Sequence, residues 1–185
     1  MTALTIASPD EMARLGAKLA AELRAGDLVL LNGELGAGKT TLTRGIGEAL
    51  GVRGAVTSPT FVLARTHPRE RRLSSPHGRI ETAVAELPPL VHVDAYRVSS
   101  AMELDDLDID FAGSIVVVEW GAGLTDGITD DWLQVDIVRR RGGAAASPTV
   151  DDVDEPSDAD AVEPREVNLT AHGDRWRGWV DAVGN

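Results

Sequence analysis

The residues best suited to chemistry lie in one short segment, 33–40, where glycine, lysine and threonine fit the spacing G-x-x-x-x-G-K-S/T. Small residues let backbone N–H groups surround phosphates, Lys39 offers a charge to the β and γ phosphates, and the Thr40 hydroxyl suits Mg²⁺. An apolar run at 28–31 precedes the segment, and a helical stripe of leucine and isoleucine follows it. The pattern therefore predicts a phosphate-binding loop between a strand and a helix, with a nucleoside triphosphate as its ligand.

Two carboxylates follow buried strands further along the chain: Asp94 comes after the run 90–93 and Glu119 after the run 115–118. In a phosphate-loop enzyme one carboxylate serves the magnesium ion, and another acidic group orients the attacking water. The sequence leaves open which of the two carboxylates has which role. His92 lies two residues before Asp94 and shares a strand face with it, and a buried core histidine is favoured there over a catalytic base.

The lysine content narrows the choice of nucleotide. Of the 18 basic residues only Lys18 and Lys39 are lysines, so an arginine-rich chain keeps lysine where a compact ammonium fits between phosphates. Neither lysine lies in the guanine-reading pattern N/T-K-x-D, because Lys18 is part of Ala-Lys-Leu-Ala and Lys39 belongs to the loop. We therefore expect ATP as the nucleotide and Mg²⁺ as its metal.

Composition and charge limit the class of protein. A chain of 185 residues with 43% hydrophobic content is sized for one domain, expected to span 1–185. Its net charge of −12 argues against an extended nucleic-acid surface, which needs clustered lysine and arginine, so any role near RNA is expected to be indirect. The sequence has no cysteine, no secretory leader pattern and no apolar run of about 20 residues. We expect a cytoplasmic protein that does not act at a membrane.

The apolar pattern predicts alternating strands and helices. Strands are expected at 4–6, 28–32, 90–94, 115–119, 133–137 and 167–171, the last two as an antiparallel pair. Ser8 and Ser100 each stand three residues before a glutamate, Glu11 and Glu103, which predicts two capped helix starts. Gly51 is expected to end the helix after the phosphate loop, and a last helix is expected to bury Trp176, Trp179, Val180 and Val183.

Two segments do not fit this alternation. Residues 65–89 read as an irregular loop with arginines at its start, and a solvated loop is favoured there over a nucleic-acid contact. Residues 151–163 carry seven acidic and no basic residues after a glycine- and alanine-rich stretch. Low hydrophobicity with like charge predicts a disordered acidic insert at 144–163, the alternative being an acidic docking tail.

Four motifs in this order resemble the TsaE (YjeE) ATPases of bacterial tRNA threonylcarbamoyladenosine synthesis. They occupy residues 33–41, 58–61, 92–97 and 118–120. The resemblance implies a P-loop NTPase-like fold, a three-layer α/β/α sandwich with a mixed central sheet. It also implies a weak, Mg²⁺-dependent ATPase that works with TsaB and TsaD, and that meets tRNA only through that complex.

The resemblance also implies roles for individual residues. Lys39 contacts phosphate, Thr40 and Glu119 serve Mg²⁺, Asp94 orients or activates water, and residues 58–60 form a loop that senses the γ-phosphate. The implied nucleotide contacts are Glu34, Leu35, Gly36, Ala37, Gly38, Lys39, Thr40, Thr41, Thr60 and Trp120.

Two other classes share the phosphate loop. A small-molecule kinase would add an acceptor pocket and an arginine-bearing lid, and the arginine-rich segment 65–79 is the feature that favours it. A nucleotide-dependent binding module would bind ATP with negligible hydrolysis.

Overall fold

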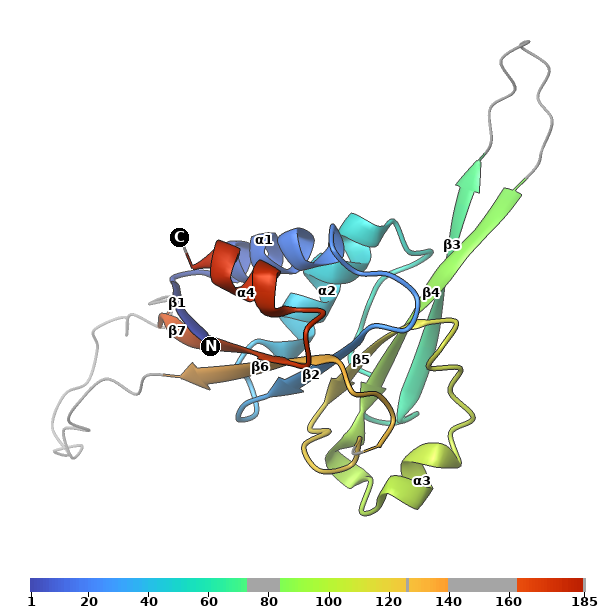
Figure 1. Cartoon of the computed structure of the whole chain (residues 1–185). Helices are drawn as coiled ribbons and strands as arrows, with labels where there is room; N and C mark the ends of the chain where they lie inside the picture. Colours follow the sequence, from blue (N-terminus) through green and yellow to red (C-terminus); the bar gives the residue numbers. More distant parts are fainter. Residues whose placement is uncertain (73–83, 126, 140–162, 185) are drawn as a thin grey trace, which may run out of the picture.

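The computed structural model describes residues 1–72, 84–125, 127–139 and 163–184, and its centre is a mixed sheet (Figure 1). Within these residues seven strands follow the order β1-β7-β6-β2-β5-β4-β3. Their bounds are Thr2–Ile6 (β1), Leu28–Asn32 (β2), Ala64–Arg72 (β3), Val84–Asp94 (β4), Ile115–Glu119 (β5), Trp132–Arg139 (β6) and Arg165–His172 (β7). The central strands β6, β2, β5 and β4 run parallel, whereas β1–β7, β7–β6 and β4–β3 are antiparallel pairs.

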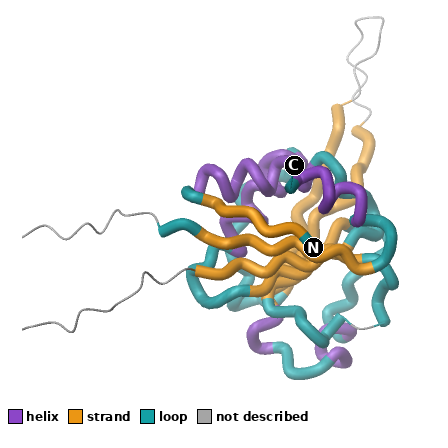
Figure 2. The backbone as a smooth tube through the Cα atoms, turned by 60° about the vertical axis from the view of Figure 1, so that its left-hand side comes forward, coloured by secondary structure: helices purple, strands orange, loops and turns teal. Residues whose placement is uncertain are grey.

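Helices cover both faces of the sheet unequally. The helices α1 (Pro9–Ala20), α2 (Lys39–Leu50) and α4 (Arg177–Val183) lie on one face. On the other face, the described residues form the short helix α3 (Ala101–Asp105), the 3-10 turn η1 (Ala95–Arg97) and loops (Figures 1 and 2). The fold is therefore of the α/β class with a mixed central sheet. No helix in the described part of the chain is long and apolar enough to cross a membrane.

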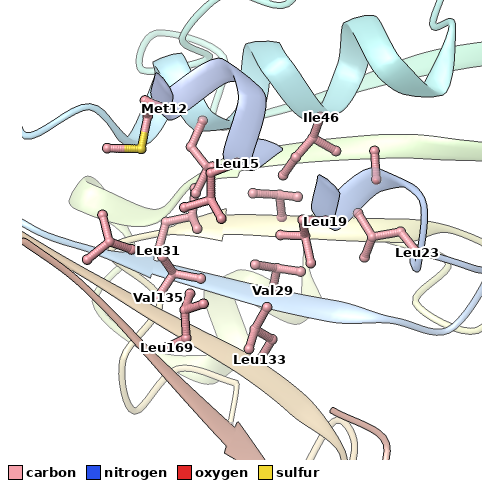
Figure 3. Packing of buried hydrophobic residues seen from close by; sticks show 14 of the residues in the cluster. Met12, Leu15, Leu19, Leu23, Val29, Leu31, Ile46, Leu133, Val135 and Leu169 are labelled. Carbon is pink, nitrogen blue, oxygen red and sulfur yellow. The ribbon is translucent and has the colours of Figure 1, made fainter. Parts of the chain in front are cut away.

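The larger hydrophobic core lies between the sheet and the helices α1, α2 and α4. An apolar stripe on α1 is formed by Met12, Leu15 and Leu19. This stripe is buried against β2 and against the inward-facing residues of β6 and β7 (Figure 3). A smaller cluster on the opposite face includes Val93, Leu104 and Val118. Strands that are buried on both faces have continuous apolar sequences, so β2 and β5 could be predicted from the sequence.

The helix boundaries follow the predicted caps. The Glu11 N–H donates to Ser8 Oγ at 3.2 Å, and the Glu11 carboxylate accepts from the Ala7 N–H at 2.7 Å. α3 begins in the same way after Ser100, and α2 ends at Gly51, whose φ of 67° suits glycine. These local signals fix where α1 and α2 enter and leave the core.

The irregular loop predicted for 65–89 is wrong for its described parts, 65–72 and 84–89, which are strands, whereas 73–83 lies outside the described residues. β3 and β4 form a long antiparallel ribbon, with Arg65 opposite His92 and Arg72 opposite Val84. The register shifts between His67 and Arg69, next to Pro68, and a shift of this kind accommodates prolines at a sheet edge. Cross-strand pairing thus overrides the loop preference of the individual residues. The predicted insert 144–163, apart from Glu163, lies outside the described residues.

Candidate nucleotide-binding site

The segment 33–38 joins β2 to α2 at the edge where the parallel strands β2, β4 and β5 end. Gly33 and Gly38 have φ values of 147° and 116°, and a Cβ on Gly33 would lie 2.5 Å from the Ile137 carbonyl oxygen. Glycine is therefore required at this turn. None of the described side chains caps the first N–H groups of α2, so these groups are available to an anion.

Lys39 is buried at the start of α2, with its ammonium group folded over the loop. Its Nζ donates to the Gly33 and Glu34 carbonyl oxygens at 2.8 and 3.1 Å and lies 3.9 Å from the centre of the Trp120 ring. Burial lowers the pKa of Lys39, and the charges of Glu119 and Asp94 oppose that shift. The lysine is thus a shielded cation whose charge an incoming phosphate would stabilise further.

Glu119 connects the phosphate loop to the neighbouring strand. The register pairs Leu31 of β2 and Asp94 of β4 with Glu119 of β5, so the predicted strand-end carboxylates do meet at one edge. Glu119 Oε1 accepts from Thr40 Oγ1 at 2.9 Å and lies 2.9 Å from the Nε2 of buried His92. Glu119 is buried, so these contacts hold its carboxylate in place.

Asp94 has partners of its own, one from the segment before β3 and one from η1. Thr60 Oγ1 donates to Asp94 Oδ2 at 2.5 Å and is 2.6 Å from Ser58 Oγ, while the Tyr96 N–H donates to Asp94 Oδ1 at 3.1 Å. The predicted γ-phosphate-sensing loop therefore contacts the carboxylate predicted to orient water. The two acidic groups of the site differ in surroundings, because Glu119 faces Thr40 and Asp94 faces Thr60.

Trp120 is held in an uncommon backbone conformation beside the loop. Its φ is 64°, its N–H donates to the Leu31 carbonyl oxygen at 3.0 Å, and its ring meets that of Tyr96 edge to face at 5.4 Å. A left-handed non-glycine residue costs about 1–3 kcal/mol and persists where the surrounding structure requires it. Here the conformation places the indole ring against Lys39.

Most of the predicted site residues line one cavity of about 190 Å³. It is lined by Leu35, Gly36, Gly38, Lys39, Thr40, Thr41, Ser58, Thr60, Asp94, Glu119 and Trp120. Of the other predicted contacts, Glu34 offers its carbonyl to Lys39, and Ala37 lines a neighbouring hollow. The described structure thus brings the predicted lysine, hydroxyls and carboxylates to one place.

Sequence reasoning missed that neighbouring hollow, which lies across the phosphate loop. It measures about 120 Å³, shares Gly36, Gly38 and Thr41 with the first cavity, and reaches Met12 and Arg165. Ser8 also lines it, although the sequence predicts only a helix start there. Arg165 comes close because β7 pairs with β1, a long-range contact with no local signal.

The donors at the site suit a hard metal ion. Among the described residues no cluster of three or more His, Cys, Asp or Glu side chains could hold a metal, so a cage made by the protein alone is not found there. The Thr40 hydroxyl and the Glu119 carboxylate, 2.9 Å apart, are instead oxygen donors of the kind that bind Mg²⁺ together with phosphates and water. These residues fit a magnesium ion that arrives with a nucleotide.

Comparison with known proteins identifies relatives over most of the chain. A curated TsaE protein from Streptomyces coelicolor, named as a tRNA threonylcarbamoyladenosine biosynthesis protein, is 49% identical over 168 residues, which cover 89% of this chain and 93% of the relative. The TsaE proteins of Mycobacterium tuberculosis and Bacillus subtilis are 44% identical over 143 residues and 30% identical over 170 residues. They cover 73% and 91% of this chain, and 77% and 85% of the respective relatives.

A solved structure has the same fold as this chain. The crystal structure of Bacillus subtilis YdiB superposes with a TM-score of 0.61 at 25% identity, covering 99% of this chain and 95% of YdiB. The model of the family described as threonylcarbamoyl adenosine biosynthesis protein TsaE matches residues 6–145, which include the phosphate loop and both strand-end carboxylates. On these grounds the chain belongs to the TsaE family.

Proposed function

We propose that this chain is the ATP-binding and ATP-hydrolysing component of the machinery that makes tRNA N6-threonylcarbamoyladenosine. The observation that carries the proposal is the meeting of Lys39, Thr40, Asp94 and Glu119 in one cavity at the start of α2, in a member of the TsaE family. The open N–H groups of α2 and the buried ammonium of Lys39 suit the phosphates of a nucleotide. Thr40 and Glu119 suit the magnesium ion of the nucleotide, and Asp94 suits the water that attacks it.

The nucleoside would occupy the hollow across the loop. Gly36, Gly38 and Thr41 line both cavities, so a phosphate chain lying along the loop would connect them. The apolar side chains of Ile6 and Met12 offer a wall for a base. A ligand that fills both hollows would then contact β1 and α1 as well as the loop.

Thr40 and Glu119 would hold the magnesium ion, which would neutralise negative charge that develops on the phosphates during cleavage. Asp94 would orient the attacking water. Its Oδ2 shares a short hydrogen bond with Thr60, so a phosphate that draws Thr60 away would free that oxygen for water. Lys39 would contact the phosphates both before and during cleavage, because its compact ammonium group fits between phosphate oxygens.

The surface around the cavity supports action with protein partners, which we propose are TsaB and TsaD. Three large side chains near the cavity are exposed. Leu35 of the phosphate loop is 91% exposed, Phe61, which follows Thr60, is 89% exposed, and Tyr96, two residues after Asp94, is 68% exposed. Large apolar side chains gathered at the mouth of a site are typical of protein contacts. With a net charge of −12, the chain would meet tRNA only through the complex, in the cytoplasm.

The kinase alternative needs arginines free to close over an acceptor. In the described part of the segment that favoured it, Arg65 donates to Thr57 Oγ1 at 3.0 Å, and Arg69 donates to the Leu50 and Pro88 carbonyl oxygens at 2.9 and 3.1 Å. Both guanidinium groups are thus engaged within the protein, which supports the assembly ATPase instead.

Two substitutions test the assignment of roles. Glu119→Ala should lose the magnesium-dependent part of ATP affinity, measured as the difference between titrations with Mg²⁺ and with EDTA. Asp94→Asn should keep ATP affinity and lose single-turnover cleavage in the presence of TsaB and TsaD. The opposite pattern would exchange the two roles, and wild-type behaviour from both variants would remove these carboxylates from the site.

A further inference from the structure

We propose that His92 is a positioning residue for Glu119: its Nε2–H holds the carboxylate beside Thr40, at the place where the two residues would bind the metal. This inference rests on the proposed function. His92 of β4 and Glu119 of β5 lie on adjacent parallel strands, and their Nε2 and Oε1 atoms are 2.9 Å apart. The histidine side chain is 0% exposed and that of the glutamate 4%, so this contact is made away from water.

The bonding pattern around Glu119 is one-sided. Oε1 takes both contacts, the one from Thr40 Oγ1 and the one from His92 Nε2, and no described residue hydrogen-bonds Oε2. An ionised carboxylate only accepts hydrogen bonds, so the contact requires the proton of His92 to lie on Nε2. The other ring nitrogen, Nδ1, makes no hydrogen bond to any described residue.

The contact of Nε2 with Glu119, and not the unpaired Nδ1, distinguishes His92 from His67, whose Nε2 is also buried and has no partner among the described residues. Among the described residues Nδ1 has no hydrogen-bond partner, although it is buried. Leaving a buried polar atom unpaired costs about 1–3 kcal/mol, a cost that leucine or valine at the same place would avoid. The histidine therefore carries a penalty for the sake of the bond made by its other nitrogen.

The neighbouring cation explains what the bond prevents. Glu119 attracts Lys39, whose ammonium lies over the phosphate loop. A carboxylate free to rotate toward Lys39 would neutralise the charge meant for phosphate and withdraw the oxygen meant for the metal. Two donors on Oε1 hold Glu119 against that rotation, as partners behind a metal-binding residue commonly do.

The reach of the amide side chains supplies a matched test. The amide nitrogen of glutamine can stand where the histidine Nε2 stands, whereas that of asparagine corresponds to Nδ1. His92→Gln should thus restore the donor to Glu119, and His92→Asn should not. We expect His92→Asn to weaken ATP affinity in Mg²⁺ about 10-fold or more, with affinity in EDTA unchanged, and His92→Gln to stay within about 3-fold of wild type.

Two measurements keep the test independent of folding and of catalysis. His67→Gln is the control, because His67 is a buried histidine of β3 whose Nε2 has no partner among the described residues, and it should leave the magnesium-dependent affinity as in wild type. In the nucleotide-free wild type, ¹⁵N NMR of the four histidines should show His92 as the Nε2–H tautomer, with a proton that exchanges more readily in Glu119→Ala.

The inference is overturned if His92→Asn binds MgATP as tightly as wild type, if His92→Gln is as impaired as His92→Asn, or if His92 carries its proton on Nδ1. Failure of the proposed function has a different signature. In that case the wild type itself would not bind ATP in Mg²⁺ or in EDTA, whatever the tautomer of His92.

Discussion

Gly45 is where α2, the helix that begins at Lys39, crosses closest to α1. A Cβ added at Gly45 would lie 2.4 Å from the Ala13 carbonyl oxygen and 2.7 Å from the Ala13 Cα. The crossing is reciprocal, because a Cβ at Gly16 of α1 would lie 2.5 Å from the Leu42 carbonyl oxygen. These neighbours are backbone atoms, so Gly45→Ala must push the two helices apart by about 1 Å to restore a normal contact of about 3.5 Å.

The expected stability change follows from two opposed effects. Overpacking in a tight interior costs about 1–3 kcal/mol and can cost more against backbone, whereas alanine gains about 1 kcal/mol over glycine in a helix. We expect Gly45→Ala to lower the free energy of unfolding by about 2 kcal/mol, or Tm by about 4–8 °C for a chain of this size.

Gly178 of α4 provides the matched control, because a Cβ there would meet no atom within 4 Å. Gly178→Ala should be neutral or stabilise by up to about 1 kcal/mol, since only the helix preference changes. Urea unfolding of the three proteins measures both effects. A Gly45→Ala variant as stable as wild type would refute the close helix crossing.

Three further predictions concern the site and its surroundings. Lys39→Ala should abolish ATP binding in a titration yet leave the apo protein's thermal midpoint at or above wild type, since burial already lowers the pKa of that lysine; a much lower midpoint would give Lys39 a role in folding. Burial is the main cause that lowers the pKa of His67, so the unfolded state takes up a proton first, and stability falls as pH drops from 6.5 toward the folded pKa. His67→Leu should lose that part of the acid sensitivity, which is at most about 1.4 kcal/mol per pH unit. Urea unfolding at pH 7.5, 6.5 and 5.5 measures it, and an equal pH dependence of wild type and variant would contradict the prediction. Phe61→Ser should keep ATP binding but weaken stimulation of hydrolysis by TsaB and TsaD; undiminished stimulation would separate the exposed rim from the partners.

The parts of the fold that local patterns determine could be predicted from the sequence. The phosphate loop, the strand ends at Asp94 and Glu119, and the cap at Ser8 each depend on neighbouring residues and on the preferences of one strand or helix. Because parallel strands end at a common edge, the meeting of the two carboxylates also followed from the pattern.

The parts that depend on pairing between distant segments could not be predicted. The ribbon of β3 and β4 contains prolines and many charged residues, so only its cross-strand register shows it to be a hairpin. Arg165 reaches the second hollow through the pairing of β7 with β1. The contact of His92 with Glu119 likewise needs the register between two strands, and the sequence alone favoured an ordinary core histidine.

The most direct test of the central claim is single-turnover cleavage of ATP by the purified wild-type chain in Mg²⁺, alone and with TsaB and TsaD. Lys39→Ala is the blank for each condition. We predict ATP binding and slow cleavage by the chain alone, faster cleavage with both partners, and none from Lys39→Ala. A wild-type chain whose cleavage does not exceed that of Lys39→Ala, with or without the partners, would contradict the account.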